Sequence, residues 1–355
     1  MPSFRLHRKK LIFGVIGAAA IGATLLYGPN QMLNRAAINE ISSDSATAPS
    51  APEVDAGNDA VIDLAGYQVP VLDDGLFARY RSNPPLSVVQ KERPALDLSW
   101  FETIDKERKE VGFTTYSPNF YYSNSSISAI YTADMSRIEE LIPPEVRDVV
   151  QPISFAPGKG LIAITSYAYH YCDNDTYNEL SISIVTTKPN QSNWGLISLM
   201  GQLNEKSLWG YVLKLPVDTE LARVRGVVGY NLPKWLIPID YDAEGSDVAF
   251  TYYDEQGNLD FSMTGKKLDI TGSEPEITRL NFVNLDAEGQ LTHGYSDVRA
   301  VEMASSRDEK DIQLELSDGP LSTYIRSLGL EKLVRYDYQP EFQAALYTPE
   351  PVQTQ

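Results

Sequence analysis

The chain has 355 residues and a formal net charge of -18, from 48 acidic and 30 basic side chains. Such an acidic surface disfavours nucleic acid as a partner, because the phosphate backbone carries the same sign of charge. Cys172 is the only cysteine, which excludes an intrachain disulfide and a thiolate zinc cluster.

Residues 1–27 predict a membrane-directing segment. Basic side chains within residues 5–10 precede an uncharged apolar run at 11–27. The run reaches the lower length limit of a spanning helix, and its basic flank predicts an N-in, C-out orientation. A signal anchor is favoured over a cleaved signal peptide, because the run continues to Tyr27 without a clear small-residue exit. We expect the body outside the cytoplasm, in the periplasm or at the exterior, and secreted if the segment is cleaved.

Composition divides the rest of the chain. Residues 28–60 are small, polar and acidic, which predicts a disordered tether. Residues 61–110 contain prolines at irregular spacing, and we interpret them as an N-terminal elaboration packed on the main body. The main domain covers 111–347, long enough to bury one large core, and a tail follows at 348–355.

The main domain is predicted to be mostly antiparallel strands. Two runs, 248–253 and 259–264, flank a short Gly-containing loop and predict a hairpin. The other predicted strands are 161–169, 180–186, 280–283 and 291–295, of which the last two form a second hairpin. Long antiparallel strands with few helices favour an α+β, mainly β fold over a doubly wound sheet.

Few helices are predicted. They are 135–142, capped by Asp134 and stopped by Pro143; 219–225, capped by Asp218; and 321–328, ended by Gly329. Gly226 and Gly229 are expected to break the second helix, because glycine has a low helix propensity.

Most standard catalytic and metal-binding patterns are missing. The three histidines have no partner at metal-ligand spacing, so a histidine metal site or a Ser-His triad is not supported and no cofactor is expected. Asp240, Asp242 and Gly245 resemble the start of a calcium loop. However, Thr251 stands where that loop needs Glu, and a surface turn is favoured.

Lys234 is the most informative side chain. It lies among apolar neighbours in 229–238 (GYNLPKWLIP). Burial disfavours a charged ammonium, so a lysine in such surroundings can become an amine nucleophile that attacks a ketone. The resulting iminium withdraws electrons from a neighbouring bond. The alternative is a lysine on a loop that extends its ammonium into solvent.

Four segments in the same order resemble the acetoacetate decarboxylase family. That family's Schiff-base lysine follows a short helix and an aromatic-Pro pair, and Lys234 ends such a segment (RGVVGYNLPK). The other matching segments are 130–146 (IYTADMSRIEELIPPEV), Tyr177-Asn178-Glu179 in place of the family's Tyr-x-Glu, and the strand and helix at 314–338. The resemblance covers about 116–338.

The resemblance implies a large curved antiparallel sheet that closes into a cone or barrel with an apolar interior. It also implies Lys234 as the imine-forming nucleophile and Glu179 as the group that positions or exchanges the proton. The predicted substrate-binding residues are Tyr230, Trp235, Asn124 and Tyr177.

Departures from the family pattern concern the same site. Asn124 stands in register with a family arginine, Trp235 replaces a second lysine, and 161–169 lacks the family's other glutamate. Losing the arginine removes a counter-ion for a substrate carboxylate, so acetoacetate itself is not the expected substrate. Asn231 and Leu232 also lengthen the segment before the lysine, which predicts a bulged loop.

The sequence therefore predicts a divergent, membrane-anchored member of this family. Its expected partner is a small carbonyl or keto-acid ligand, and its expected chemistry is that of a Schiff-base lyase, either decarboxylase or aldolase-like. The alternative is a non-catalytic ligand-binding or scaffolding module on the same fold. Assembly into a homo-oligomer is left open.

Overall fold

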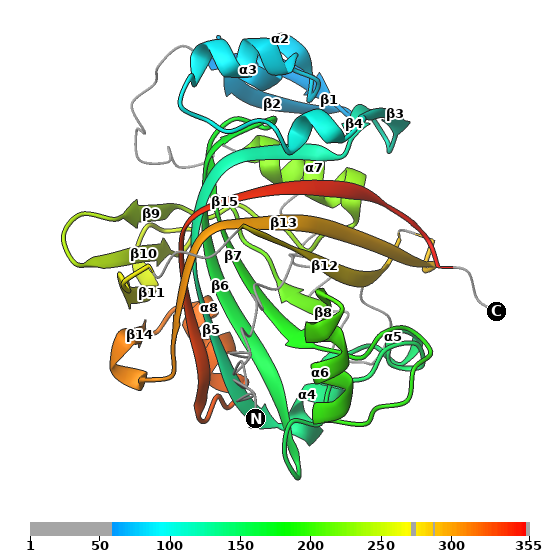
Figure 1. Ribbon diagram of the computed structural model, residues 1–355, viewed down its shortest axis with the longest axis vertical. Coiled ribbons are helices and arrows are strands. Elements are labelled where there is room, and N and C mark those ends of the chain that lie inside the picture. The colour runs from blue at the N-terminus through cyan, green and yellow to red at the C-terminus, as the bar shows by residue number, and fades with distance from the viewer. Residues whose placement is uncertain (1–58, 271–274, 287, 353–355) are drawn as a thin grey trace, which may run out of the picture.

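The computed structural model describes residues 59–270, 275–286 and 288–352 (Figure 1). The predicted membrane-directing segment and nearly all of the predicted tether lie outside the described residues, so both stay predictions. Among the residues that are described, no helix is both long enough and apolar enough to cross a bilayer.

The centre of the molecule is a closed barrel with the strand order β12-β13-β15-β5-β6-β7-β8. Its strands are β5 (Asn119–Asp134), β6 (Lys159–Cys172), β7 (Tyr177–Val185), β8 (Ser207–Lys214), β12 (Glu276–Leu285), β13 (Leu291–Ser306) and β15 (Leu333–Pro351). Neighbouring strands pair antiparallel, except that β8 pairs in parallel with β12. The predicted α+β, mainly antiparallel fold with a sheet closed into a barrel is confirmed.

Alternation along the strands sets the inner face of the barrel. On β13, Thr292, Gly294, Ser296 and Val298 are buried, whereas the residues between them are half-buried. Because successive side chains of a strand point to opposite faces, the buried set faces the interior. Leu291 of β13 pairs with Leu285 of β12, which confirms the second predicted hairpin.

A second, four-stranded sheet lies beside the barrel in the order β14-β11-β10-β9 (Figure 1). Its strands are β9 (Ile239–Asp242), β10 (Asp247–Tyr253), β11 (Leu259–Lys266) and β14 (Ile312–Leu316). The antiparallel pair β10 and β11 confirms the first predicted hairpin, and β6 and β7 confirm the strands at 161–169 and 180–186.

Helices connect several of the strands along the chain. Beyond the N-terminal region they are α4 (Met135–Leu141), α5 (Pro144–Arg147), α6 (Leu196–Asn204), α7 (Glu220–Tyr230) and α8 (Pro320–Ser327), with a 3₁₀ turn η2 (Glu309–Asp311). The predicted helix after Asp134 is confirmed as α4, whose first turn is capped by the Asp134 carboxylate accepting from Ser136 N. The predicted helix before Gly329 is confirmed as α8, which begins and ends one residue earlier than predicted.

The prediction for the middle helix, α7, is wrong at both ends. Thr219 is the capping residue, because its hydroxyl oxygen accepts from Ala222 N. Asp218 instead directs its carboxylate across to β7, where it accepts from the backbone N and the Nδ2 of Asn178, each at 2.8 Å.

Gly226 and Gly229 lie inside α7 and do not break it. A Cβ on Gly226 would lie 2.4 Å from Lys234 Cδ, and one on Gly229 would lie 2.9 Å from the ring of Phe113. These glycines therefore allow two side chains to approach the helix backbone closely, and that packing offsets their low helix propensity.

Residues 59–110 form a cap over one end of the barrel (Figure 1). It contains β1 (Asp59–Leu64), β2 (Tyr67–Leu72), α2 (Leu76–Tyr80), α3 (Leu86–Glu92), a 3₁₀ turn η1 (Phe101–Thr103) and β3 (Glu107–Glu110), which pairs with β4 (Thr114–Ser117). Strand β1 begins inside the range predicted as tether, and β15 continues into the range predicted as tail. Strand β1 forms a hairpin with β2, the next strand, whereas β15 pairs with β13 and with the distant β5.

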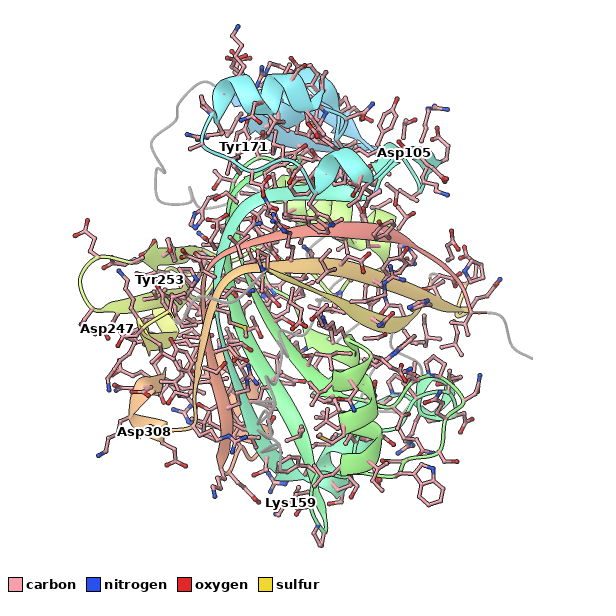
Figure 2. All side chains as sticks on the ribbon, in the orientation of Figure 1. Asp105, Lys159, Tyr171, Asp247, Tyr253 and Asp308 are labelled. Carbon is pink, nitrogen blue, oxygen red and sulfur yellow. The ribbon has the colours of Figure 1, made fainter. Side chains whose placement is uncertain are left out.

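Polar contacts fix the cap on the barrel. Figure 2 shows Tyr171 of β6 beside the cap, where its hydroxyl donates to Glu92 at 2.5 Å. Deeper in the joint, the cap residue Lys106 lies 2.5 Å from Asp173, whose carboxylate is fully buried. Asp173 also accepts from the Tyr122 hydroxyl at 2.8 Å.

Candidate functional site

Lys234 and Glu179 meet inside the protein although 55 residues separate them in the chain. Lys234 Nζ lies 2.5 Å from Glu179 Oε2, and the two side chains are 6% and 2% exposed. The alternative of a lysine that extends into solvent is therefore wrong for Lys234. At this distance a proton can pass between the amine and the carboxylate.

Backbone hydrogen bonds of Val217 bring the two segments together. Val217 N donates to Trp235 O at 3.0 Å and Val217 O accepts from Ile237 N at 3.0 Å, while Val217 also bridges to Glu179 on β7. One residue thus ties the strand that carries the carboxylate to the loop that carries the amine.

The loop that follows α7 and leads to Lys234 has the bulge that the additional Asn231 and Leu232 predict. Asn231 ends α7 in the left-handed region with φ 55, and Leu232 turns back so that its N donates to Gly226 O at 3.0 Å. Lys234 N then donates to Leu232 O at 2.8 Å. This turn directs the lysine stem over the face of Gly226, where the absence of a Cβ leaves room for it.

The ion pair forms part of the wall of a cavity of about 50 Å³ inside the barrel. The lining residues are Tyr121, Tyr167, Tyr169, Tyr177, Glu179, Leu232, Lys234, Leu280, Ser296, Val298, Gln339, Phe342, Ala344 and Leu346. All of these residues follow the cap in the chain. The cap therefore holds the barrel end without lining this cavity.

Strand register explains why these side chains converge. Gln339 of β15 pairs with Ser126 of β5, Ser126 with Tyr167 of β6, and Tyr167 with Glu179 of β7. Residues paired directly across a sheet point to the same face. This row therefore places a carboxylate, a phenol, a hydroxyl and an amide along one level of the barrel wall.

Tyrosine hydroxyls surround the ion pair. Tyr169 donates to Glu179 Oε1 at 3.1 Å, and the hydroxyls of Tyr121 and Tyr177 lie 3.0 Å apart. Burial raises the pKa of Tyr121, Tyr169 and Tyr177 well above the ordinary value, so these groups remain protonated donors. The ring of Tyr177 lies 5.4 Å from Lys234 Nζ, close enough for its π face to stabilise a cation there.

Of the predicted substrate-binding residues, Tyr177 lines the cavity. Asn124 is buried on β5 between Phe342 and Tyr169, and its Nδ2 donates to the carbonyl of Phe342 at 2.9 Å. Asn124 does not line the cavity. The substrate-binding roles of Tyr177 and Asn124 stay predictions.

The other two predicted substrate-binding residues also lie outside the lining set. Tyr230 is buried at the end of α7 with apolar neighbours that include Phe282. The Trp235 ring points toward β8, with Lys214 Nζ 5.8 Å from its centre. The chain direction reverses at Pro233, so residues adjacent to Lys234 in sequence face different parts of the protein. Their substrate-binding roles stay predictions.

Tyr121, Tyr167, Tyr169 and Gln339 are lining residues that the sequence analysis did not select. Three tyrosines spaced by two along 167–171 (YAYHY) were a signal, because alternate residues of a strand share a face. Gln339 carries no such signal, since its position depends on pairing with a strand more than 200 residues earlier.

Within the described ranges, no group of three or more His, Cys, Asp or Glu side chains is arranged to hold a metal ion. The reactive groups at this site are one amine, one carboxylate and several phenols. Together they can form an imine with a carbonyl compound, stabilise the resulting cation and exchange protons with the bound molecule.

No protein-family model and no curated protein matches the chain. Solved structures of similar fold include an acetoacetate decarboxylase from Legionella pneumophila, with 13% identity and a TM-score of 0.49 over 66% of this chain and 87% of that one. The enduracididine biosynthesis enzyme MppR has 13% identity and a TM-score of 0.47, covering 66% of this chain and 89% of that one. An acetoacetate decarboxylase-like enzyme from Sphingomonas wittichii has 12% identity and a TM-score of 0.40, covering 67% of this chain and 94% of that one. Because the identities and TM-scores are low, the chemistry of this chain is argued from the residues of its own site.

Proposed function

We propose that the protein is acetoacetate decarboxylase-like and acts on a small carbonyl or keto-acid compound through a Schiff base at Lys234. The observation that carries this proposal is the buried contact of 2.5 Å between Lys234 Nζ and Glu179 Oε2 at the wall of a cavity. An ion pair inside a protein is weak evidence for stability, because removing both charges from water costs nearly as much as their attraction returns. A reactive role accounts for both groups.

The pair supplies what imine formation requires. Transfer of a proton from Lys234 to Glu179 leaves a neutral amine, which attacks the carbonyl carbon of the ligand. The carbon–oxygen bond breaks, and the oxygen leaves as water with both amine hydrogens. Glu179 then returns its proton to the imine nitrogen, so a cationic iminium faces a carboxylate, as the ammonium did before.

The iminium then accepts an electron pair from a neighbouring bond. In a β-keto acid that bond is the one to the carboxylate carbon, which leaves as carbon dioxide, and an enamine remains. Protonation of the enamine carbon and addition of water release the ketone and restore the amine. The Tyr177 ring stabilises the cation, and Tyr169 orients the carboxylate.

Borohydride trapping tests the proposal. A panel of keto acids and ketones is incubated with the protein and reductant, and the modified lysine is located by peptide mass spectrometry. We expect label on Lys234 and its loss in Lys234→Ala, while Glu179→Gln slows labelling. Lys214 is the matched control, because burial lowers its pKa yet it lies outside the cavity, and Lys214→Met should label like the wild type.

A protein that binds these compounds without forming an imine would be the non-catalytic module. In that case ligands raise the melting temperature in the wild type and in Lys234→Ala alike, and no lysine is labelled. That pair of results would refute the Schiff-base proposal.

A further inference from the structure

The wall of the cavity has no net charge. Lys234 and Glu179 are the charged members of its lining among the described residues, and they neutralise each other. The other members are apolar side chains, phenols, one hydroxyl and one amide. A second carboxylate, brought in by a keto acid, would leave one uncompensated negative charge in a wall of low polarity, which is strongly unfavourable.

Gln339 is the neutral polar group on the wall formed by β15. Its side chain belongs to a residue that is 4% exposed, and its Oε1 accepts from the Ser126 hydroxyl at 3.2 Å. Its Nε2 has no hydrogen-bond partner within the part of the chain that the structure describes. A buried amide N–H without an acceptor is unfavourable, and a ligand oxygen would satisfy it.

The register of the barrel fixes this amide relative to the reactive pair. Gln339 and Glu179 belong to one row of paired residues, with Ser126 and Tyr167 between them. The two end residues are therefore three strands apart on a curved wall and both border the cavity. A ligand whose carbonyl carbon is held at Lys234 therefore occupies the same cavity as the Gln339 amide.

We propose that Gln339 determines specificity by donating a hydrogen bond from Nε2 to an uncharged acyl oxygen of the ligand. The favoured substrates are neutral dicarbonyl, keto-ester or hydroxy-carbonyl compounds, and keto acids are disfavoured. The inference rests on the proposed imine at Lys234. A neutral donor suits this class, because it satisfies an acyl oxygen without providing the counter-charge that a carboxylate needs.

The test compares keto acids with their methyl esters, which keep the acyl oxygen and remove the charge. Pyruvate, acetoacetate and levulinate are each paired with the corresponding methyl ester, so the length between the two carbonyl groups also varies. The readout is the initial rate of reductive labelling of Lys234. For the wild type we expect at least one ester to label about tenfold faster than its acid.

Variants of Gln339 separate its role from packing. Gln339→Met keeps the length of the side chain and removes the donor, so ester labelling should fall about tenfold while acid labelling stays low. Gln339→Lys adds a cation, so acid labelling should rise and the preference should reverse. Circular dichroism and thermal unfolding check that each variant is folded, and Ser126→Ala, which releases Oε1, provides a second site where the preference should weaken.

The outcomes distinguish the two proposals. If neither acids nor esters label Lys234 in the wild type, the imine chemistry fails and the specificity inference fails with it. If Lys234 is labelled but acids react as fast as esters, or if the preference is the same in all Gln339 variants, the specificity inference alone is refuted.

Discussion

Substituting Gly226 by alanine tests how the lysine is held. The new Cβ would lie 2.4 Å from Lys234 Cδ and 2.7 Å from Cε. Ordinary carbon contacts are about 3.5 Å, so the lysine stem must move by about 1 Å. The 2.5 Å contact between Nζ and Glu179 would then lengthen to about 3.5 Å, beyond hydrogen-bond range. We expect labelling of Lys234 to slow by up to about a hundredfold.

Gly201 provides the matched control for this substitution. It lies in α6, and a Cβ there would meet no heavy atom within 4 Å. Alanine should stabilise either helix by about 1 kcal/mol through helix propensity. Overpacking at Gly226 should cost about 1–3 kcal/mol, so Gly226→Ala should unfold at a lower denaturant concentration than Gly201→Ala. Equal unfolding curves together with wild-type labelling in Gly226→Ala would refute the packing argument.

Three further substitutions give distinct results. Tyr169→Phe removes the donor to Glu179 and should slow imine formation by about tenfold, measured by borohydride labelling; an unchanged rate would show that the hydroxyl does not orient the carboxylate. Lys106→Met leaves the buried Asp173 carboxylate without a cation and should lower the free energy of unfolding in urea by about 3–5 kcal/mol; a loss within error of zero contradicts this. Asp218 concerns pH. Burial raises its pKa from 3.8 to about 6, so the protonated form stabilises the fold fully below about pH 4 and that contribution is lost as pH rises through 6. The wild type should therefore lose up to about 3 kcal/mol relative to Asp218→Asn between pH 4 and 7 in urea unfolding, and a constant difference refutes the assignment.

Local signals in the sequence predicted local structure well. The Asp134 cap, the turn between β10 and β11 and the stop at Gly329 each depend on a few adjacent residues, and all three are found. The closed barrel followed from the resemblance and the strand pattern. The low propensity of glycine misled the prediction of α7, because Gly226 serves a contact with a residue beyond the helix.

The site was predictable only where chemistry marks a residue. A lysine among apolar neighbours and a Tyr-x-Glu motif identified Lys234 and Glu179, which the structure brings into contact. The lining residues Tyr121 and Gln339 belong to strands far apart in sequence, and bulges in the pairing of β5 with β15 shift their register. Hydrophobic alternation predicts which face is buried, but not which rows of neighbouring strands meet.

Strand β8 has a consequence for how a ligand enters. It is held on one side by four pairs with β12, from Ser207 to Gly210, and on the other by four pairs with β7. The β5–β6 ladder, by contrast, extends from Tyr121 to Asp134. Local opening costs least where few backbone hydrogen bonds must break, so among the seven barrel strands we expect β8 to detach most easily. Leu280, which lines the cavity, pairs with β8. We therefore expect a ligand to enter the barrel where β8 pairs with β12 and β7, the strands that close it.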